Sequence, residues 1–186
     1  MCGCSLVLAG DLKIHVVSAA ALSAQTWEQV LALCDLAYGE DLRAIFRGFT
    51  NPVHVFATAG GAIASHALWV TRWLAPNGNP PLRTAYVEGV ATDPVHQNRG
   101  YASAVMRVLV SQVSAFQLAA LCPSDRGHAL YSRLGWEEWI GPLFIRQGAE
   151  LIPTPDESIM IYRLPGTPPL NPKDPLSAEW RRGELW

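Results

Sequence analysis

The sequence predicts a single α/β domain, residues 1–186, built around a mixed β-sheet. Strand-like and helix-like segments are mixed along the chain, an order typical of one α/β domain. Hydrophobic residues make up 49% of the 186 residues, enough for one well-buried core. A third observation is a proline-rich segment, residues 165–186, with no sign of an internal repeat or a second domain.

Apolar periodicity and turn residues place the elements in order. Helix 26–38 carries apolar residues at helical spacing, with Thr26 and Gln29 as a capping box and Gly39 at its end. Gly60 and Gly61 predict a hairpin turn. The expected strands are 12–17, 54–58, 63–73, 84–91, 117–122, 139–147 and 158–164, and the other expected helices are 41–49, 101–114 and 125–134.

Composition argues against several classes of protein. The net charge is −2 with no long basic run, so nothing favours a nucleic-acid partner. Apolar stretches are interrupted well before the length of a membrane span, and no signal peptide is recognised, which predicts a cytoplasmic protein. Reduced thiols are expected for Cys2, Cys4, Cys34 and Cys122. The histidines are scattered, so no metal site is expected.

The most informative stretch is residues 86–104, in which a strand leads through a glycine-containing loop into a helix. Successive N–H groups at a helix N-terminus attract an anion, and Arg99 adds a positive charge. This chemistry suits a pyrophosphate. A glycine before a helix is also a common turn, so the pattern alone leaves a plain loop open.

The pattern of Gln97–Ala102, Q-x-x-G-x-A, resembles the pyrophosphate-binding motif of the GNAT superfamily of acetyltransferases, and Tyr131–Trp136 matches its second signature, Y-x-x-x-G-W. The resemblance implies a central mixed, mostly antiparallel sheet with a splayed strand pair, flanked by helices, and acetyl-CoA as co-substrate. It also implies a possible homodimer. The implied cofactor-binding residues are Val90, Ala91 and Thr92 for the pantetheine arm, and Gln97, Asn98, Arg99, Gly100, Tyr101 and Ala102 for the pyrophosphate.

Four further segments, YVEGVA at 86–91, residues 130–136, TPDE at 154–157 and WRRGELW at 180–186, resemble the aminoglycoside 2′-N-acetyltransferases. The resemblance implies that acidic groups hold a cationic aminoglycoside, since ammonium groups need carboxylates. The Pro-rich segment 165–186 is then expected to fold back on the substrate site. The implied substrate-binding residues are Glu40, Glu88, Gly89, Cys122, Asp156, Glu157, Glu184 and Trp186, the last through its α-carboxylate.

Two positions depart from the better-known members of that family. Cys122 stands where they carry a serine, and Ile45 stands where they carry a further acidic residue. Fewer carboxylates suggest an acceptor with fewer amines, and kasugamycin fits that description. The charge argument supports this antibiotic without selecting it.

The expected reaction is direct transfer of an acetyl group to an amine. Glu88 is the candidate general base, through water, and Tyr131 the candidate general acid toward the coenzyme A sulfur. Trp186 is the third candidate catalytic residue, and the N–H near Val90 is a candidate oxyanion donor. For Tyr131 and Trp186, packing in the core remains the alternative. No histidine is paired with Cys122 in the sequence, which argues against a covalent acetyl-cysteine.

Two other functions stay open at this point. The first is an acetyltransferase of another amine, namely a polyamine, a lysine or a peptide N-terminus. The second is a coenzyme A binding module without catalysis, although Glu88 and Tyr131 are both present. No nucleic-acid or membrane partner is expected for any of these.

Overall fold

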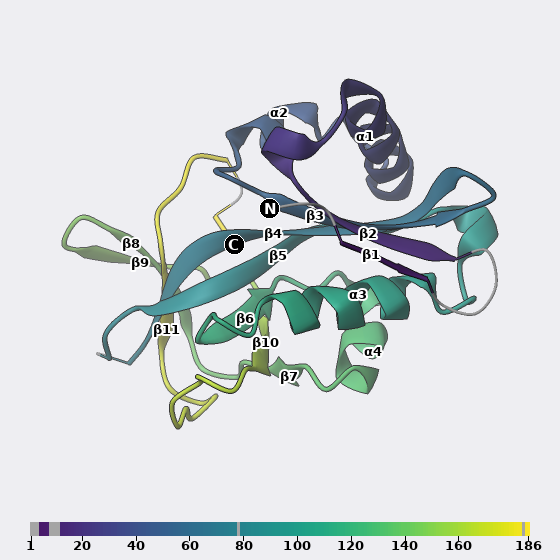
Figure 1. Ribbon diagram of the computed structural model, residues 1–186. Helices are drawn as coiled ribbons and strands as arrows, with labels where there is room; N and C mark the ends of the chain where they lie inside the picture. Colours follow the sequence, from purple (N-terminus) through teal and green to yellow (C-terminus); the bar gives the residue numbers. More distant parts are fainter. Residues whose placement is uncertain (1–3, 8–11, 78, 184) are drawn as a thin grey trace. The chain divides into compact units, whose positions relative to one another are not determined.

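The computed structural model describes residues 4–7, 12–77, 79–183 and 185–186 (Figure 1). The chain forms two compact units. Unit 1 comprises Met1–Val70 and Val87–Gln112, and unit 2 comprises Thr71–Tyr86 and Val113–Trp186. Strands β4 (Ala62–Pro76) and β5 (Leu82–Thr92) each contribute residues to both units. The single domain expected from the sequence stays a prediction.

Unit 1 is an antiparallel sheet with helices on both faces. Its strands pair in the order β1-β2-β3-β4. Figure 1 shows α1 and α2 on one side of β2, β3 and β4, and α3 on the other. The strands and helices complete in this unit are β1 (Cys4–Val7), β2 (Lys13–Ser18), β3 (Val53–Ala59), α1 (Ala24–Tyr38), α2 (Arg43–Gly48) and α3 (Tyr101–Gln112), with short 3₁₀ turns η1 (Ala19–Ala21) and η2 (Pro94–His96).

Unit 2 mixes parallel and antiparallel strands. Strand β5 pairs with β6 in parallel, and β8 pairs with β11 in parallel, whereas β6–β10, β10–β7, β8–β9 and β4–β11 are antiparallel. The mixed, mostly antiparallel sheet is therefore confirmed. The elements complete in this unit are β6 (Leu118–Leu121), α4 (Asp125–Arg133), β7 (Glu137–Glu138), β8 (Leu143–Gln147), β9 (Glu150–Pro153), β10 (Met160–Arg163) and β11 (Leu176–Glu179).

The parallel pair β5–β6 is short. Residues Thr84, Ala85 and Tyr86 of β5 pair with Leu118, Ala119 and Ala120 of β6, and β5 then continues to Thr92. A strand that runs on past its partner exposes its backbone groups to other partners. This is the splayed arrangement that the family resemblance implied.

The start of α1 differs from the expectation. Ser23, and not Thr26, is the N-cap, because the Ser23 Oγ accepts from the Thr26 N–H at 3.1 Å. The helix consequently begins at Ala24. Its expected end is confirmed: Gly39 has φ +77° and its N–H donates to the Asp35 carbonyl at 2.8 Å. Gly60 and Gly61 also form the expected hairpin turn.

The expected strand 139–147 is only half a strand, because β8 begins at Leu143. A Cβ on Gly141 would lie 2.0 Å from the Asp174 carbonyl oxygen, so two backbone segments meet there at a distance that only glycine permits. The expectation also missed β1, β7, β9 and β11. No helix in the described part of the chain is long and apolar enough to cross a membrane.

Candidate active site

The expected pyrophosphate loop lies in unit 1, between β5 and α3. Residues 97–100 are exposed, and Asn98 and Gly100 have left-handed backbones with φ +59° and +82°. The first N–H groups of a helix have no partner within the helix, and here Ala104 is the first to bond back, to the Gly100 carbonyl at 2.9 Å. The first amides of α3 therefore have no partner within the helix, as binding of an anion there requires.

The reason for glycine at position 100 is conformational. A Cβ on Gly100 would meet nothing within 4 Å, so space does not require glycine there. The left-handed φ does, since an L-residue is strained in that region. Beside the loop, the His96 and Tyr101 rings stack edge to face at 5.3 Å, and the buried Nδ1 of His96 has no hydrogen-bond partner among the described residues.

The end of β5 carries the residues expected to hold the pantetheine arm. The carbonyls of Val90 and Ala91 accept hydrogen bonds from the Tyr38 hydroxyl at 3.3 Å and from the Ser65 hydroxyl at 3.0 Å. The carbonyls of both residues thus already have partners within the protein. Their role in binding the cofactor stays a prediction.

Unit 1 also holds two of the expected acidic residues. Glu88 lies on β5 and is half-buried, immediately before Gly89. Glu40 follows the C-cap of α1 and is exposed. Ile45, on α2, is half-buried. Glu88 thus lies beside the expected cofactor segment and Glu40 at the surface, and their roles stay predictions.

Tyr131 lies in unit 2 on α4 and is 6% exposed. Its ring packs 6.1 Å from that of Trp136, and a Cβ on Gly127 would lie 2.8 Å from Tyr131 Cε2. Burial, with a smaller contribution from Cys122, raises the pKa of the Tyr131 phenol well above its ordinary value of 10. The hydroxyl thus keeps its proton at physiological pH, as a general acid must before it acts.

Cys122 follows β6, is exposed and forms no disulfide. Its Sγ lies 3.8 Å from the Glu157 carboxylate. Exposure rules out plain packing in the core. The structure thus brings together two of the expected substrate residues that are separated by 35 positions in the sequence.

Trp186 belongs to unit 2 and is 4% exposed. Its indole Nε1 donates to the Thr154 hydroxyl at 2.8 Å, and its carbonyl oxygen accepts from Arg181 at 3.1 Å. The Glu157 N–H in turn donates to the Thr154 carbonyl at 3.3 Å. One connected cluster therefore joins Trp186 through Thr154 to Glu157 and Cys122.

Arg72 forms hydrogen bonds with the terminal segment that carries Trp186. This arginine was not identified from the sequence. Its side chain is buried and donates to the Leu185 carbonyl at 2.7 Å and to the Glu179 carbonyl at 2.8 Å. Its guanidinium also lies 4.9 Å from the centre of the Tyr86 ring. A lone arginine inside an apolar strand, as in residues 66–76, is the signal that was available, because a buried charge requires partners.

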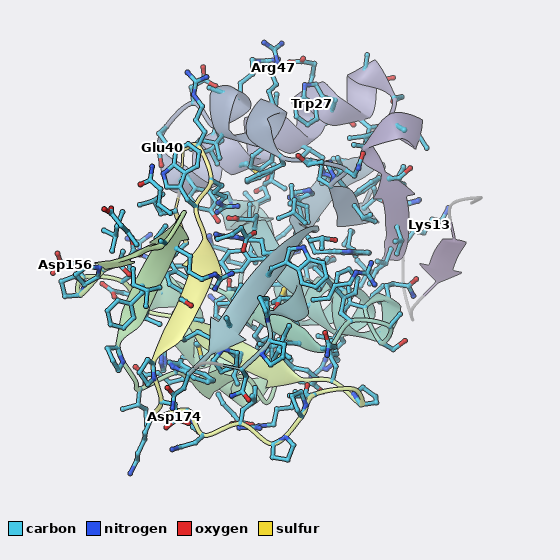
Figure 2. All side chains as sticks on the ribbon, turned by 90° about the vertical axis from the view of Figure 1, so that its left-hand side faces the viewer. Lys13, Trp27, Glu40, Arg47, Asp156 and Asp174 are labelled. Carbon is cyan, nitrogen blue, oxygen red and sulfur yellow. The ribbon has the colours of Figure 1, made fainter. Side chains whose placement is uncertain are left out.

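The remaining expected residues are placed as follows. Asp156 is exposed, and Figure 2 shows it projecting outward from the loop after β9. Glu184 lies outside the described residues. Among the described residues, no group of three or more His, Cys, Asp and Glu is arranged to hold a metal ion. Among the tryptophans of unit 2, Trp73 and Trp180 are about half exposed, whereas Trp139 and Trp186 are buried.

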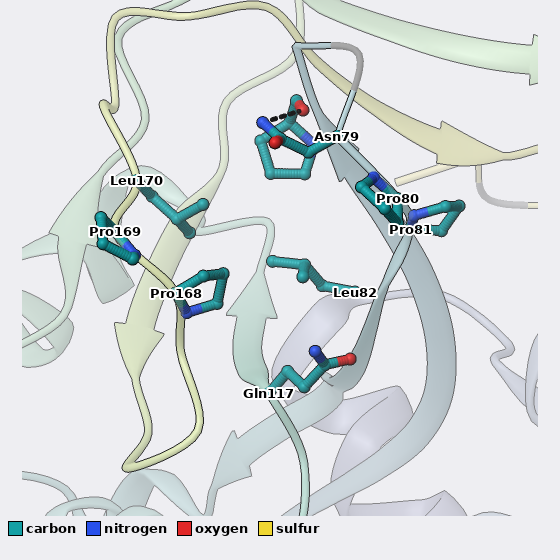
Figure 3. Close-up of a pocket in the computed structure, with 9 residues that line it drawn as sticks. Asn79, Pro80, Pro81, Leu82, Gln117, Pro168, Pro169 and Leu170 are labelled. Atoms are coloured by element: carbon teal, nitrogen blue, oxygen red, sulfur yellow. Dashed lines mark hydrogen bonds between the residues drawn. The ribbon is translucent and has the colours of Figure 1, made fainter.

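A cavity of about 200 Å³ in unit 2 is separate from these residues (Figure 3). It is lined by Pro76, Asn79, Pro80, Pro81, Leu82, Gln117, Pro168, Pro169 and Leu170. Its lining contains none of the expected site residues and almost no charge. The residues expected to carry the chemistry therefore lie outside this cavity.

Comparison with known proteins agrees with these observations. Residues 19–139 match the family described as acetyltransferase (GNAT) domain. The chain is 36% identical over 140 residues to an aminoglycoside 2′-N-acetyltransferase of Mycolicibacterium fortuitum, covering 72% of this chain and 71% of that protein.

Solved structures show the same fold. The GNAT N-acetyltransferase YhbS from Escherichia coli, in complex with CoA, superposes with a TM-score of 0.63 at 16% identity over 97% of both chains. Eis1 from Mycobacterium abscessus gives 0.57 at 20% identity, covering 68% of this chain but only 32% of that one. The chain therefore spans about a third of the length of some of its structural relatives. Together with the sequence matches, these results show that the chain belongs to the GNAT family of acetyltransferases and is related within it to the aminoglycoside 2′-N-acetyltransferases.

Proposed function

We propose that the protein transfers the acetyl group of acetyl-CoA to the 2′-amino group of an aminoglycoside, with kasugamycin or a related antibiotic as acceptor. The observation that carries this choice of acceptor is the 36% identity to an aminoglycoside 2′-N-acetyltransferase over 72% of the chain. The docked terminal segment supports it, because Trp186 lies in a cluster with Thr154 and the exposed Glu157 carboxylate.

The residues of unit 1 suit acetyl-CoA. Amides at the start of α3 that have no partner within the helix, with the exposed Arg99 beside them, match the charge and hydrogen-bonding needs of a pyrophosphate. The structural relative YhbS was solved in complex with CoA. In this proposal residues 97–102 bind the pyrophosphate and residues 90–92 bind the pantetheine arm. When bound, acetyl-CoA supplies the thioester whose acetyl group is transferred.

Exposed carboxylates suit a cationic acceptor. Asp156 and Glu157 are exposed in unit 2, and Glu40 is exposed in unit 1. Ammonium groups form strong, charge-assisted hydrogen bonds with such groups. Ile45 is half-buried and uncharged, so this chain has one carboxylate fewer at that point than the better-known relatives. This supports kasugamycin over the more highly charged deoxystreptamine drugs.

Acetyl transfer to an ammonium requires two protons to leave the nitrogen and one to reach the departing sulfur. Glu88 takes a proton from the acceptor ammonium through water, which frees the nitrogen lone pair to attack the acetyl carbonyl carbon. The Val90 N–H stabilises the oxyanion that forms. The C–S bond then breaks, Tyr131 donates its phenolic proton to the departing sulfur, and the nitrogen loses its second proton to solvent as the amide forms. Proton exchange with solvent afterwards restores the Glu88 carboxylate and the Tyr131 phenol. The raised pKa of Tyr131 keeps that proton in place until the sulfur becomes basic.

The proposal is tested by thiol release from acetyl-CoA with a panel of amines, namely kasugamycin, gentamicin, tobramycin, spermidine and a lysine peptide. We expect kasugamycin to have the highest kcat/KM, and mass spectrometry with NMR to place the acetyl group on the 2′-amine. A higher kcat/KM for gentamicin or tobramycin would contradict the choice of kasugamycin. Turnover of only spermidine or the peptide would contradict an aminoglycoside acceptor.

The role in the cell follows as a second step of the same proposal. An enzyme that acetylates the antibiotic removes an ammonium group on which the drug's binding depends, and so confers resistance. Expression of the parent chain in a susceptible bacterium is expected to raise the inhibitory concentration of the preferred drug. Expression of Tyr131→Phe serves as the matched control and is expected to leave that concentration at the level of the empty vector.

A further inference from the structure

Two buried histidines form a hydrogen-bonded chain within unit 1. His54 lies on β3 and His66 on β4, and both side chains are 0% exposed. The His54 Nδ1 and His66 Nε2 atoms are 2.9 Å apart. The His66 Nδ1 lies 2.8 Å from the carbonyl oxygen of Gly89 on β5. The chain therefore runs from His54 through His66 to the backbone of the segment expected to carry the chemistry.

The Gly89 carbonyl, at one end of this hydrogen-bonded chain, determines which ring nitrogens of His54 and His66 carry a proton. A carbonyl oxygen only accepts, so His66 Nδ1 must carry a proton and donate it. A neutral His66 then has a lone pair on Nε2, which accepts from the His54 Nδ1–H. Burial lowers the pKa of His54 to about 4 and that of His66 to about 3, so both rings are neutral at physiological pH.

Cys34 and Trp27 contact the two histidine rings, and neither side chain is charged. Cys34 of α1 lies 3.7 Å from His66 Nδ1, and burial raises the pKa of this thiol to about 12, so it stays neutral. Trp27 packs edge to face on His54 at a ring distance of 6.2 Å. His54 Nε2 is buried with no hydrogen-bond partner among the described residues. The hydrogen-bonded chain of the two histidines therefore ends at His54 in the protein interior and at the Gly89 carbonyl on β5.

The carbonyl that His66 holds belongs to an unusual backbone position. Gly89 has φ +57° inside a strand, and a Cβ there would lie 2.6 Å from the Phe46 ring. The Gly89 carbonyl shares one planar, trans peptide unit with the Val90 N–H. In such a unit the oxygen and the hydrogen point in opposite directions. Fixing the carbonyl on His66 therefore aims the Val90 N–H away from His66.

We propose that His66 is a positioning residue for acetyl transfer, which acts through the Gly89–Val90 peptide, and that His54 orients it. The inference rests on the function proposed above, in which the Val90 N–H stabilises the oxyanion. Two effects follow from the His66–Gly89 hydrogen bond. It sets the direction of the Val90 N–H, and it polarises the peptide so that the N–H becomes a stronger donor, because linked hydrogen bonds reinforce each other.

Four variants separate positioning from plain packing. His66→Leu removes the donor to Gly89, whereas His66→Asn places an amide nitrogen near the former Nδ1. His54→Leu removes the orienting partner. Thr84→Val is the control: Thr84 is also 0% exposed on β5, but its hydroxyl donates to the local Leu82 carbonyl at 3.0 Å.

In steady-state kinetics with saturating acetyl-CoA, His66→Leu is expected to lower kcat by roughly 10- to 100-fold, since loss of one oxyanion donor costs up to about 10³-fold. The acetyl-CoA dissociation constant, measured by calorimetry, is expected to change little. His66→Asn is expected to recover most of the loss, and His54→Leu to lose less than His66→Leu. Thr84→Val is expected to keep the parent kcat. A parent-like kcat in folded His66→Leu would overturn the proposal.

NMR of the ¹⁵N-labelled protein tests the same inference without any acceptor. The ring nitrogen shifts are expected to show His66 protonated on Nδ1 alone, with scalar coupling across the His54–His66 hydrogen bond. The Val90 amide proton is expected to move upfield in His66→Leu and in His54→Leu, but not in Thr84→Val. If no aminoglycoside is acetylated while these signals hold, the proposed acceptor fails and the peptide geometry stands. An Nε2-protonated or charged His66, or an unchanged Val90 amide, overturns the inference itself.

Discussion

The indole Nε1 of Trp186 donates a 2.8 Å hydrogen bond to the Thr154 hydroxyl, 32 residues earlier in the chain. Thr154 also links through its carbonyl to the Glu157 N–H at 3.3 Å. A hydrogen bond from a side chain that is 4% exposed therefore connects the terminal segment with the loop that carries Asp156 and Glu157. The family resemblance assigned both the terminal segment and the loop at residues 154–157 to acceptor binding. Hydrogen bonds join these two segments in the structure.

This relationship predicts the behaviour of Trp186→Phe. The variant keeps an aromatic ring but loses the N–H, so the free energy of unfolding is expected to fall by about 1 kcal/mol. The loop with Asp156 and Glu157 loosens, and the acceptor KM is expected to rise by roughly threefold to tenfold. Urea unfolding and steady-state kinetics measure the two effects.

Trp139→Phe is the matched control for that variant. Trp139 is also 4% exposed and donates its indole N–H at 2.8 Å, but to the Asp174 carbonyl. A similar loss of stability with an unchanged acceptor KM is expected. An equal rise of the acceptor KM in both variants would show that Trp186 contributes only packing.

Tyr131→Phe tests general acid catalysis. The ring and its packing on Trp136 remain, while the hydroxyl is lost, so kcat is expected to fall on the order of 10²–10⁴-fold. Tyr162→Phe is the control, because Tyr162 packs on the same Trp136 at 5.6 Å and has no assigned role in the reaction. A kcat for Tyr131→Phe close to that of Tyr162→Phe would show that Tyr131 only packs. Stopped-flow thiol detection measures both.

Gly100→Glu tests the pyrophosphate loop. The variant places a negative charge at the start of α3 and forces an L-residue to φ +82°, so acetyl-CoA binding is expected to be lost. Gly60→Glu is the control, since Gly60 also has a left-handed φ, of +59°, and open space around it. Each variant is expected to cost about 1–2 kcal/mol of stability through backbone strain. If calorimetry finds that folded Gly100→Glu binds acetyl-CoA with the affinity of the parent protein, this loop is not part of the cofactor site.

The buried histidines predict how stability depends on pH. In the unfolded chain both titrate near 6.5, whereas burial lowers their folded pKa to about 4 for His54 and about 3 for His66. Between these values the unfolded chain binds the extra protons. The free energy of unfolding is therefore expected to fall as the pH drops below about 6.5, by up to about 1.4 kcal/mol per pH unit for each group. Below about pH 3 this contribution levels off.

Urea unfolding at several pH values between about 7 and 4.5 measures that slope. His54→Asn is expected to reduce it, because one of the two groups no longer titrates. Thr84→Val changes an equally buried side chain that does not titrate and is expected to keep the slope. A pH profile of stability that is flat in the parent protein would mean that the two rings are not held neutral by burial.

The sequence by itself determined the features that depend on neighbouring residues. The end of α1 at Gly39, the hairpin at Gly60–Gly61 and the exposed loop before α3 are local, and they were predicted because backbone conformation and helix ends follow from a few adjacent residues. The motifs at residues 97–102 and 131–136 are likewise made of a few neighbouring residues. They sufficed to predict the fold and the co-substrate.

Only the tertiary structure decided which distant residues meet. β11 was missed because proline-rich segments give no periodic signal, and it is formed by pairing with β4 and β8. The contacts of His66 with His54 and Gly89, and of Trp186 with Thr154, likewise depend on strand register and on how the terminal segment docks. A single sequence holds no local record of such pairings, since hydrogen bonds between distant residues form only once the whole core has packed around them.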